Sequence, residues 1–315
     1  MGACLIIFSV IKKTIKRFIP VGVLSRLEHA REFSLDRKRY LRNSAPSDDA
    51  ASARLKGRNL EAQLTKDYHR VEKGLALRDP KRPFGAGVLK RLDMLIPIAE
   101  AKDGAAKYVS FAQSARIALL EWNDGMAVAE GISPVRAACA GGTDDVRRLF
   151  NTRRSTRDFG DRAVPLEDLI EAVELAINTP SVCNRQAWHV RFQLDREDIV
   201  QSLAFQNGNT GFTDNIPALA IVTVDSQLFA GSGERNQGWI EGGLFSMSLV
   251  WALHGMGIDS CMLNMSLPNR RTDALRKELG IPDHELIIMM IAIGYGREGH
   301  RIARSPRRDI AEVIR

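Results

Sequence analysis

The chain has 315 residues, 44% of them hydrophobic, which is enough to bury a large core in one domain or in two smaller ones. Its formal net charge is +7, yet residues 1–58 alone hold 13 Lys or Arg against 5 Asp or Glu, a net of +8 that leaves −1 for all other residues. The globular part is therefore close to neutral, which argues against a nucleic-acid-binding protein.

The N-terminal arm combines apolar and basic residues. In residues 1–24, an apolar helical face would lie beside Lys13, Lys16 and Arg17, and such a segment would suit an anionic membrane surface. A helix docked on its own domain and a mobile basic terminus are the alternatives. The apolar run is shorter than the roughly 20 residues that span a bilayer, and its charges follow it, unlike those of a signal peptide. We therefore expect a cytoplasmic protein, held peripherally at the inner membrane face under the first alternative.

The next segments indicate where domains begin. Small and polar residues 43–58 predict a linker, and residues 59–130 read mostly as helix, including a long stretch from Val88 to Ala129. A second break falls near residues 140–143. We expect an arm and linker over 1–58, a helical region over 59–143 and one further domain over 144–315. The four cysteines show no metal-binding spacing, so free thiols and no metal site are expected.

From Asp144 onward, helical and strand patterns alternate. Residues 144–152 and 166–178 predict helices that precede the first strand, 188–192. The predicted elements that follow are helix 196–206, strand 218–224, helix 237–256, strand 258–263, helix 272–280 and strand 285–296.

A basic pentapeptide follows the first of these helices. Arg153, Arg154, Ser155, Thr156 and Arg157 bring three guanidinium groups and two hydroxyls together. Arg offers a planar fork of donors to phosphate, so the segment suits an anion site. The alternative is a solvated helix end, where Arg also complements the helix dipole.

The loop before the first strand is unusually rich in hydrogen-bonding groups. Pro180 ends the helix, and Ser181, Asn184 and Gln186 offer hydroxyl and amide groups. Amides suit the edge of a heterocycle, and simple turn capping is the alternative.

Two later segments complete the set of candidates. Residues 257–265 place Leu263 and Asn264 at the end of a strand, where backbone N–H groups would reach a flat ligand. The alternative is an ordinary connection between a helix and a strand. Residues 301–308 form a second basic cluster, which either joins the first around one phosphate or is a solvated tail.

Taken in order, these segments resemble the nitroreductase family of flavin enzymes. The resemblance rests on the combination of RRSTRDF (153–159), VPLEDLIEAVELAINTPSVCNRQAW (164–188), GNTGFTDNIPALAIV (208–222), WIEGGLFSMSLVWALHGMGIDSCMLN (239–264) and IIMMIAIGYG with RSPRRDIAEVI (287–314). It implies an α+β fold of three layers, with a central, mostly antiparallel sheet flanked by helices and preceded by the mainly helical N-terminal region. It also implies a homodimer with two FMN molecules at its interface.

The resemblance also assigns roles to residues. Arg153, Arg154, Ser155 and Arg157 would line the phosphate, ribityl and pyrimidine side of FMN. Pro180, Ser181, Asn184 and Gln186 would lie at the ring of the FMN held by the partner chain, Asn209 at its pyrimidine end, and Leu263 and Asn264 near flavin N5. Arg304 and Arg307 are candidates for a second phosphate clamp. The family usually has Pro where this chain has Ala187.

The implied activity is that of an FMN-dependent NAD(P)H oxidoreductase of nitroreductase type. It would reduce a small organic acceptor (a nitro compound, a quinone or a pathway intermediate) by ping-pong hydride transfer, with the cofactor carrying the chemistry and no separate catalytic residue. Arg157 and Asn209 would stabilise the reduced flavin electrostatically. The alternative is a non-catalytic flavin-binding or scaffold protein.

The helical region carries one weaker resemblance. Residues 67–75 look like a "YHxxEKG" segment that precedes the flavin domain in a subset of the family linked with surface-polysaccharide pathways. His69, Glu72 and Lys73 would share a helical face, and Gly74 would cap the helix. A polar helix that covers the flavin domain or the dimer interface is one interpretation, and a substrate site is the other.

Overall fold

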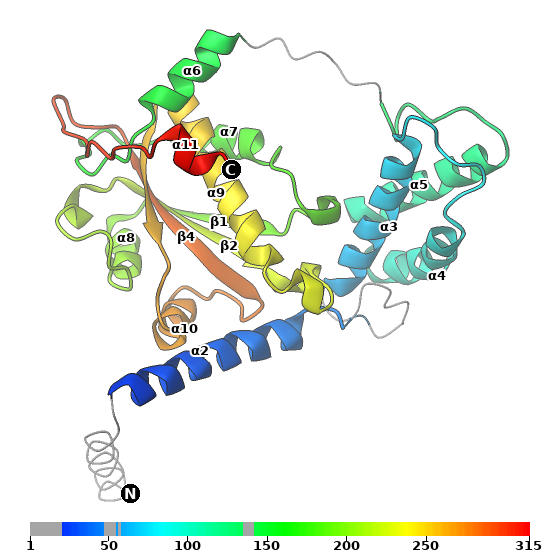
Figure 1. Cartoon of the computed structure of the whole chain (residues 1–315), viewed down its shortest axis with the longest axis horizontal. Helices are drawn as coiled ribbons and strands as arrows, with labels where there is room; N and C mark the ends of the chain where they lie inside the picture. The colour runs from blue at the N-terminus through cyan, green and yellow to red at the C-terminus, as the bar shows by residue number, and fades with distance from the viewer. Residues whose placement is uncertain (1–20, 47–54, 56–57, 135–141) are drawn as a thin grey trace, which may run out of the picture.

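The computed structural model describes residues 21–46, 55, 58–134 and 142–315 (Figure 1). Its centre is a four-stranded sheet in the order β1-β2-β4-β3, in which every neighbouring pair is antiparallel. The strands are β1 (Trp188–Gln193), β2 (Ala218–Asp225), β3 (Asp259–Asn264) and β4 (Glu285–Gly294). All four lie where the alternating pattern predicts them, and the expected α+β class is confirmed.

Helices cover both faces of the sheet, as the alternation along β2 requires. Ala220 and Val222 point into one core, together with α7 and α9, whereas Leu219 and Ile221 point into the other, with α8 and α10. All eight residues of β2 are buried, as expected of a central strand with a hydrophobic layer on each side. The helices of this domain are α6 (Thr143–Thr152), α7 (Leu166–Ala176), α8 (Arg196–Leu203), α9 (Gln237–Gly255), α10 (Asn269–Glu278) and α11 (Ile310–Val313).

Helix α9 crosses the sheet at an unusually short distance. A Cβ built on Gly242 would lie 2.5 Å from Cγ1 of Ile288 in β4, and one on Gly238 would lie 2.8 Å from Leu286 Cδ1. Only glycine permits this approach, so the two glycines bring the start of α9 against the beginning of β4. That position matters for the site, because the loop before β1 is anchored on the same part of α9.

The first described helix, α2 (Val21–Asn43), docks on the domain rather than extending away from it. Its Glu32 accepts hydrogen bonds from the backbone and side chain of Asn269, at 2.7 and 3.0 Å, and its Arg39 forms an ion pair with Asp273 at 2.6 Å. These contacts tie residues 21–43 to α10, and the three alternatives for residues 1–24 stay untested. Residues 1–20, which hold most of the predicted membrane segment, and 47–54 and 56–57 of the predicted linker lie outside the described residues.

A separate helical unit stands beside the sheet domain (Figure 1) and consists of α3 (Asn59–Leu75), α4 (Ala86–Asp103) and α5 (Lys107–Asn123). It has its own apolar core. At its centre, the fully buried Asp67 accepts hydrogen bonds from Arg91 Nε at 2.9 Å and from Gln63 at 2.9 Å, and pairs with Arg70 at 3.1 Å. Burial without such partners would be costly, so Asp67 is a structural residue of this unit.

Two expectations for the helical unit were wrong. The long helical stretch from Val88 to Ala129 is two helices, because the chain breaks around Gly104 between α4 and α5. Gly74 does not cap α3, which continues to Leu75 and is followed by Ala76 as its C-cap. A Cβ on Gly74 would lie 2.5 Å from the Phe84 ring, so the glycine is needed to admit that ring.

The helical unit is fastened to the end of the sheet. Arg58 Nη1 lies 3.3 Å from Asp225 at the end of β2 and 3.3 Å from Nε2 of His189. Asn59 donates to the Gln227 carbonyl at 2.6 Å, and the Arg58 N–H donates to the Gln227 side chain at 3.0 Å. These contacts fix the start of α3 against the end of β2 and the turn that follows it. None of the helices within the described ranges is both long and apolar enough to cross a membrane.

Candidate functional site

The basic pentapeptide lies along the edge strand β3. Helix α6 ends at Thr152, and the chain then extends so that Ser155 forms a parallel bridge with Ser260. The N–H of the buried Thr156 donates to the Ser260 carbonyl at 3.1 Å. The backbone of the segment is thus part of the fold, while the side chain of Arg157 is exposed and those of Arg153 and Arg154 are half-buried.

These arginines form a cluster of positive charge. Partial burial lowers the pKa of Arg153, and the neighbouring Arg154 and Arg307 guanidinium groups lower it further. Among the described residues, no carboxylate forms an ion pair with Arg153, Arg154, Arg157 or Arg307. Arg307 thus reaches the first cluster, whereas no contact of the exposed Arg304 joins it there. A cluster of like charges without a counter-charge is suited to a bound anion such as a phosphate.

Cys261 lies within this cluster but is not a reactive thiol. Burial raises the pKa of the Cys261 thiol, although Arg157, Arg153 and a hydrogen bond with Ser155 act in the opposite direction. A buried, neutral thiol is a poor nucleophile. Cys261 therefore serves as packing, and its surroundings place Ser155 and Arg157 at the start of β3.

The opposite end of β3 meets the loop that carries Asn209. Gln206 donates to the Asn264 carbonyl at 2.7 Å, and a Cβ on Gly208 would lie 3.6 Å from Leu263. The side-chain nitrogen of Asn209 is already used within the loop, where it donates to Thr213 Oγ1 at 2.8 Å. The structure therefore brings Asn209, Leu263 and Asn264 together. Gln206, which holds them there, was not anticipated from the sequence.

The loop before β1 has a strained backbone. Cys183, Asn184 and Gln186 have φ values of 50°, 54° and 48°, in the region that non-glycine residues seldom adopt. At Cys183 and Gln186 this conformation costs on the order of 1–2 kcal/mol each, whereas asparagine, as at Asn184, adopts it more readily. Three residues at positive φ within four positions require strong support from the neighbouring groups. In this conformation the loop exposes the side chains of Asn184 and Gln186.

Arg185 supplies most of that support. Its side chain is completely buried and forms a two-point ion pair with Glu234, at 2.6 and 2.9 Å. It also donates to the carbonyls of Leu228, at 2.7 Å, and Val182, at 3.1 Å. The loop is therefore tied to the segment after β2 by one guanidinium, which sequence analysis did not single out.

Glu241 of α9 also anchors the loop that precedes β1. Its Oε1 accepts the Val182 N–H at 2.7 Å, whereas its buried Oε2 has no hydrogen-bond partner within the described residues. Burial raises the pKa of Glu241, with the hydrogen bonds from Val182 and Gln237 acting against it. Ser181 adds a further tie, because its Oγ accepts the Gln186 N–H at 3.0 Å.

The two groups of candidate residues lie at diagonally opposite corners of the sheet. The strained loop precedes Trp188 on edge strand β1, while Ser155 is bridged to Ser260 on edge strand β3. In the strand register, Trp188 of β1 pairs with Val224 near the end of β2. Ser260 of β3 pairs with Ile293 of β4, which in turn pairs with Ala218 at the start of β2. Three strand spacings of about 4.8 Å and six steps of about 3.4 Å separate the corners, so the distance is about 25 Å. One chain therefore does not bring the arginine cluster and this loop into one pocket.

Metal-binding chemistry has no visible place in the site. No group of three or more His, Cys, Asp or Glu residues that would hold a metal ion occurs among residues 21–46, 58–134 and 142–315. The Cys183 and Cys261 thiols are both free.

The comparisons with known proteins agree with the fold. The model of the nitroreductase family matches residues 151–204 and 191–295. A protein from Archaeoglobus fulgidus, provisionally described as an NADH dehydrogenase/NAD(P)H nitroreductase, is 29% identical over 157 residues, which are 49% of this chain and 87% of that protein. Nitroreductase NfnB from Mycolicibacterium smegmatis is 25% identical over 215 residues, covering 53% of this chain and 91% of that protein.

A solved structure covers the same part of the chain. The protein ydfN from Bacillus subtilis, provisionally described as a nitroreductase, aligns with a TM-score of 0.50 at 20% sequence identity, over 55% of this chain and 99% of that one. At this identity the likeness speaks for the fold alone. Together with the family match, it leads to one conclusion: the C-terminal part of this chain, residues 151–295, is similar to the nitroreductase family of oxidoreductases in sequence and in fold.

Proposed function

We propose that the protein is an FMN-dependent oxidoreductase, a homodimer that oxidises NAD(P)H and reduces a small organic acceptor in a ping-pong reaction. The observation that carries the proposal is the separation of the candidate residues. An arginine cluster without a counter-charge lies at one corner of the sheet, and a strained loop bearing amides lies at the other. Two copies related by a twofold axis would complete two equivalent sites, each with a cluster from one chain and a loop from the other.

The residues present fit FMN. Arg153, Arg154 and Arg307 would hold the phosphate, because they lack carboxylate partners among the described residues. Asn184 and Gln186 would meet the ring edge with amide donors and acceptors. Bound FMN would supply the hydride chemistry. The role of the chain is to bind and orient the cofactor and to keep the loop in one conformation.

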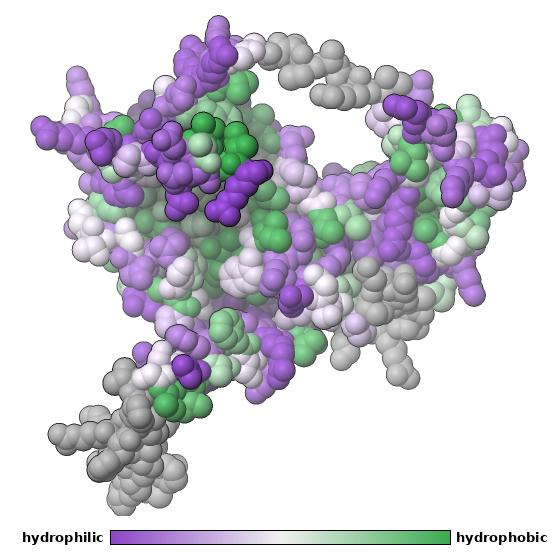
Figure 2. All heavy atoms as spheres, in the orientation of Figure 1, coloured by the Kyte–Doolittle hydropathy of each residue, from purple (hydrophilic) through white to green (hydrophobic). Residues whose placement is uncertain are grey.

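An exposed apolar surface supports the homodimer. Helix α9 buries one face in the core, yet Trp239, Ile240 and Leu244 on its other face are 48%, 53% and 44% exposed. In α11, Ile310 and Val313 are also more than 60% exposed. Figure 2 shows apolar residues gathered around α11. Monomeric proteins seldom expose large contiguous apolar patches, so a second copy would cover this one.

The first test is a visible absorption spectrum of the purified full-length chain, before and after NADPH is added without oxygen. A flavin band that bleaches supports the proposal. A folded chain without colour that takes up no added FMN would refute it, and a bound flavin that NADPH does not bleach would favour the scaffold alternative. Sedimentation velocity tests the dimer: Ile240→Glu with Leu244→Glu should give monomers, whereas Leu194→Glu, which also adds a charge at an exposed apolar position, should not.

The arginine cluster is tested by FMN affinity. Hydrogen bonds to charged groups contribute about 1.5–3 kcal/mol each, so Arg153→Ala with Arg157→Ala should weaken FMN binding at least about 100-fold. Arg147→Ala with Arg148→Ala removes the same charge from the outer side of α6, where both side chains are at least 70% exposed, and should retain FMN. Equal affinity for both double variants, measured by fluorescence titration, would contradict the assignment.

A further inference from the structure

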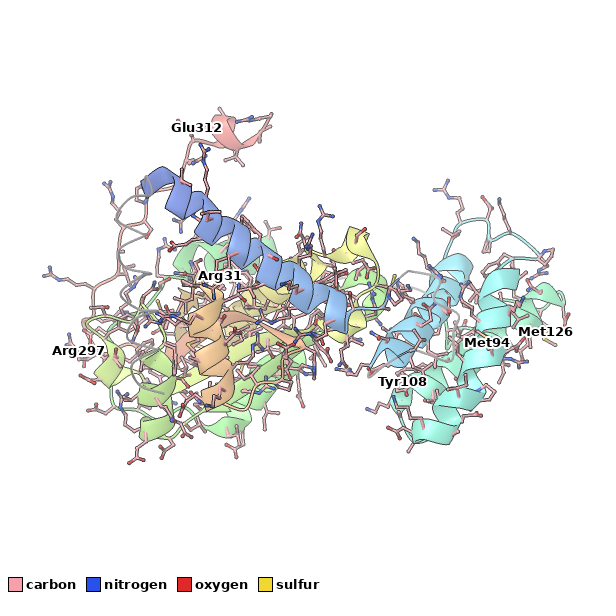
Figure 3. The ribbon with its side chains drawn as sticks, turned by 90° about the horizontal axis from the view of Figure 1, so that it is seen from below. Arg31, Met94, Tyr108, Met126, Arg297 and Glu312 are labelled. Atoms are coloured by element: carbon pink, nitrogen blue, oxygen red, sulfur yellow. The ribbon has the colours of Figure 1, made fainter. Side chains whose placement is uncertain are left out.

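A pocket joins the helical unit to the strained loop. It has a volume of about 300 Å³, and its lining comes from both parts of the chain: Arg58, Glu61, Thr65, Tyr68, Lys107, Tyr108, Phe111, Asn184, Arg185 and Gln186. Larger hollows of about 610 and 630 Å³ lie between α2 and α10, but no candidate flavin residue lines them. The pocket at the loop combines candidate flavin residues with groups from the helical unit. In Figure 3, Tyr108 lies on the side of the helical unit that faces the sheet domain, while Met126 lies on the far side.

Ion pairs hold both walls of this pocket. On the helical side, Arg58 forms a two-point ion pair with Glu61, with both distances 2.7 Å, and reaches Asp225 at the end of β2. On the loop side, the buried Arg185–Glu234 pair holds the backbone between Asn184 and Gln186. Neither wall would need to move for a ligand to bind, so the ordering cost of binding would be small.

The charges that face the pocket are unequal. Arg58 pairs with both Glu61 and Asp225, and Arg185 pairs with Glu234. Lys107, the first residue of α5, is exposed and forms no ion pair with any carboxylate in the described part of the chain. The first turn of α5 holds no acidic residue, so its dipole adds to the positive potential. Lys107 is therefore the cation of this lining that can pair with an anionic substituent of a ligand.

The remaining groups are aromatic rings and neutral donors. Tyr68 and Phe111 pack edge to face with their centroids 6.0 Å apart, and Tyr108 lies beside them in the lining. Burial raises the pKa of Tyr68 and of Tyr108, so both phenols stay protonated at neutral pH and can donate hydrogen bonds. Two phenols, two amides and aromatic faces suit a small planar molecule with polar substituents.

We propose that this pocket is the acceptor site of the enzyme, and that it binds a small aromatic acceptor with an anionic substituent, held by Lys107 between the helical unit and the loop. The inference rests on the proposed function in one respect, namely that Asn184 and Gln186 face the flavin. It also gives the polar segment of α3 a specific use: Thr65 and Tyr68 line the pocket, whereas His69 and Glu72 of the same helix bond to each other at 3.1 Å.

The test uses two acceptors that differ in charge and little in shape, 4-nitrobenzoate and 4-nitrobenzamide. Each reaction consumes one NADPH and one proton: the nitro group gains two electrons, one N–O bond breaks, and the products are the nitroso compound, NADP⁺ and water. One ion pair is worth roughly 1 kcal/mol at a partly exposed site, so kcat/KM should favour 4-nitrobenzoate about five- to tenfold. Lys107→Gln should abolish that preference and Lys107→Glu should invert it.

The matched control is Lys90→Gln, which removes an exposed lysine of α4 that does not line the pocket. It should leave the preference unchanged, and flavin content should be equal in all variants. The inference is overturned if wild type shows no preference for the anion, or if Lys90→Gln changes the preference as much as Lys107→Gln does.

Equilibrium dialysis of 4-nitrobenzoate against the full-length chain separates this inference from the proposed function. Binding that Lys107→Gln weakens, in a chain that NADPH does not reduce, would keep an anion site here but overturn its role as an acceptor site. A chain that is reduced by NADPH, and binds 4-nitrobenzoate equally well with and without Lys107, would keep the proposed function and refute the pocket.

Discussion

The ion pair between Arg185 and Glu234 should act as a single unit that holds the strained loop. The Arg185 side chain is fully buried and that of Glu234 is 18% exposed, and they meet at 2.6 and 2.9 Å. Replacing Arg185 by Met leaves a nearly buried carboxylate with only the Ala230 N–H, at 2.7 Å, as a described partner. Breaking a buried pair from one side costs about 3–5 kcal/mol. That is a large share of the roughly 5–15 kcal/mol by which domains are stable.

The double variant supplies the decisive comparison. Arg185→Met with Glu234→Met removes both charges, and replacing a buried pair by apolar groups is often nearly neutral. Some loss should remain, because the carbonyls of Leu228 and Val182 lose their donor. We expect the double variant to recover about 2–3 kcal/mol relative to the sum of the single variants, measured by urea unfolding at pH 7. Additive single losses would refute the view that the pair is one coupled unit.

Three further predictions concern the backbone and the core. At Cys183, whose φ and ψ are 50° and 30°, the Gly variant should be more stable than the Ala variant by about 1 kcal/mol. At the control position Lys90 in α4, the Ala variant should be the more stable one by a similar amount. If urea unfolding gave the same order of stability at both positions, the strain at Cys183 would be contradicted. Burial raises the folded-state pKa of Glu241 above its ordinary 4.5. The stability of wild type that is present below pH 4.5 is therefore lost as the pH rises through the folded pKa, and Glu241→Gln should become more stable relative to wild type over that window. A difference in unfolding free energy that does not change with pH would argue against this. Gly242→Ala should lower the free energy of unfolding by about 1–3 kcal/mol, because the new Cβ overpacks against Ile288. Gly87→Ala should not lower it, because its Cβ would meet only the end of Arg91 at 3.8 Å. Equal unfolding midpoints for the two variants would rule out the close approach of α9 to β4.

The secondary structure of the sheet domain was readable from the sequence because its signals are local. Apolar spacing defines α7, and the continuous apolar runs of β2 and β4 match strands that are buried on both faces. In the helical unit, the same reasoning wrongly predicted one continuous helix through Gly104. A single glycine among good helix formers is not a reliable sign that a helix ends. The reasoning failed at Gly74 for a different reason. The Phe84 ring that requires this glycine comes from a later segment, so no local pattern reveals it.

The support of the candidate site was not readable, because it depends on contacts between distant segments. In the sequence, Arg185 is a cation in a polar loop and suggests a solvated side chain, yet its partner Glu234 lies 49 residues away and buries it. The positive φ values of Cys183 and Gln186 leave no signal either, since both residues are ordinary loop residues. The diagonal placement of the arginine cluster and the loop follows only from the strand order β1-β2-β4-β3.

Ala187 stands where the resemblance to the nitroreductase family leads us to expect proline, and the loop around it is restrained by other contacts. A proline at that position would restrict the backbone by its ring, whereas here the neighbouring Arg185 restrains the loop through its side chain, and the Ala187 carbonyl accepts the Asp225 N–H at 2.8 Å. Asp225 is also the residue that receives Arg58 from the helical unit. The loop and the helical unit are therefore braced against the same end of β2. A rigid loop at this point would serve both proposed surfaces at once, because Asn184 and Gln186 would face the flavin on one side and the acceptor pocket on the other.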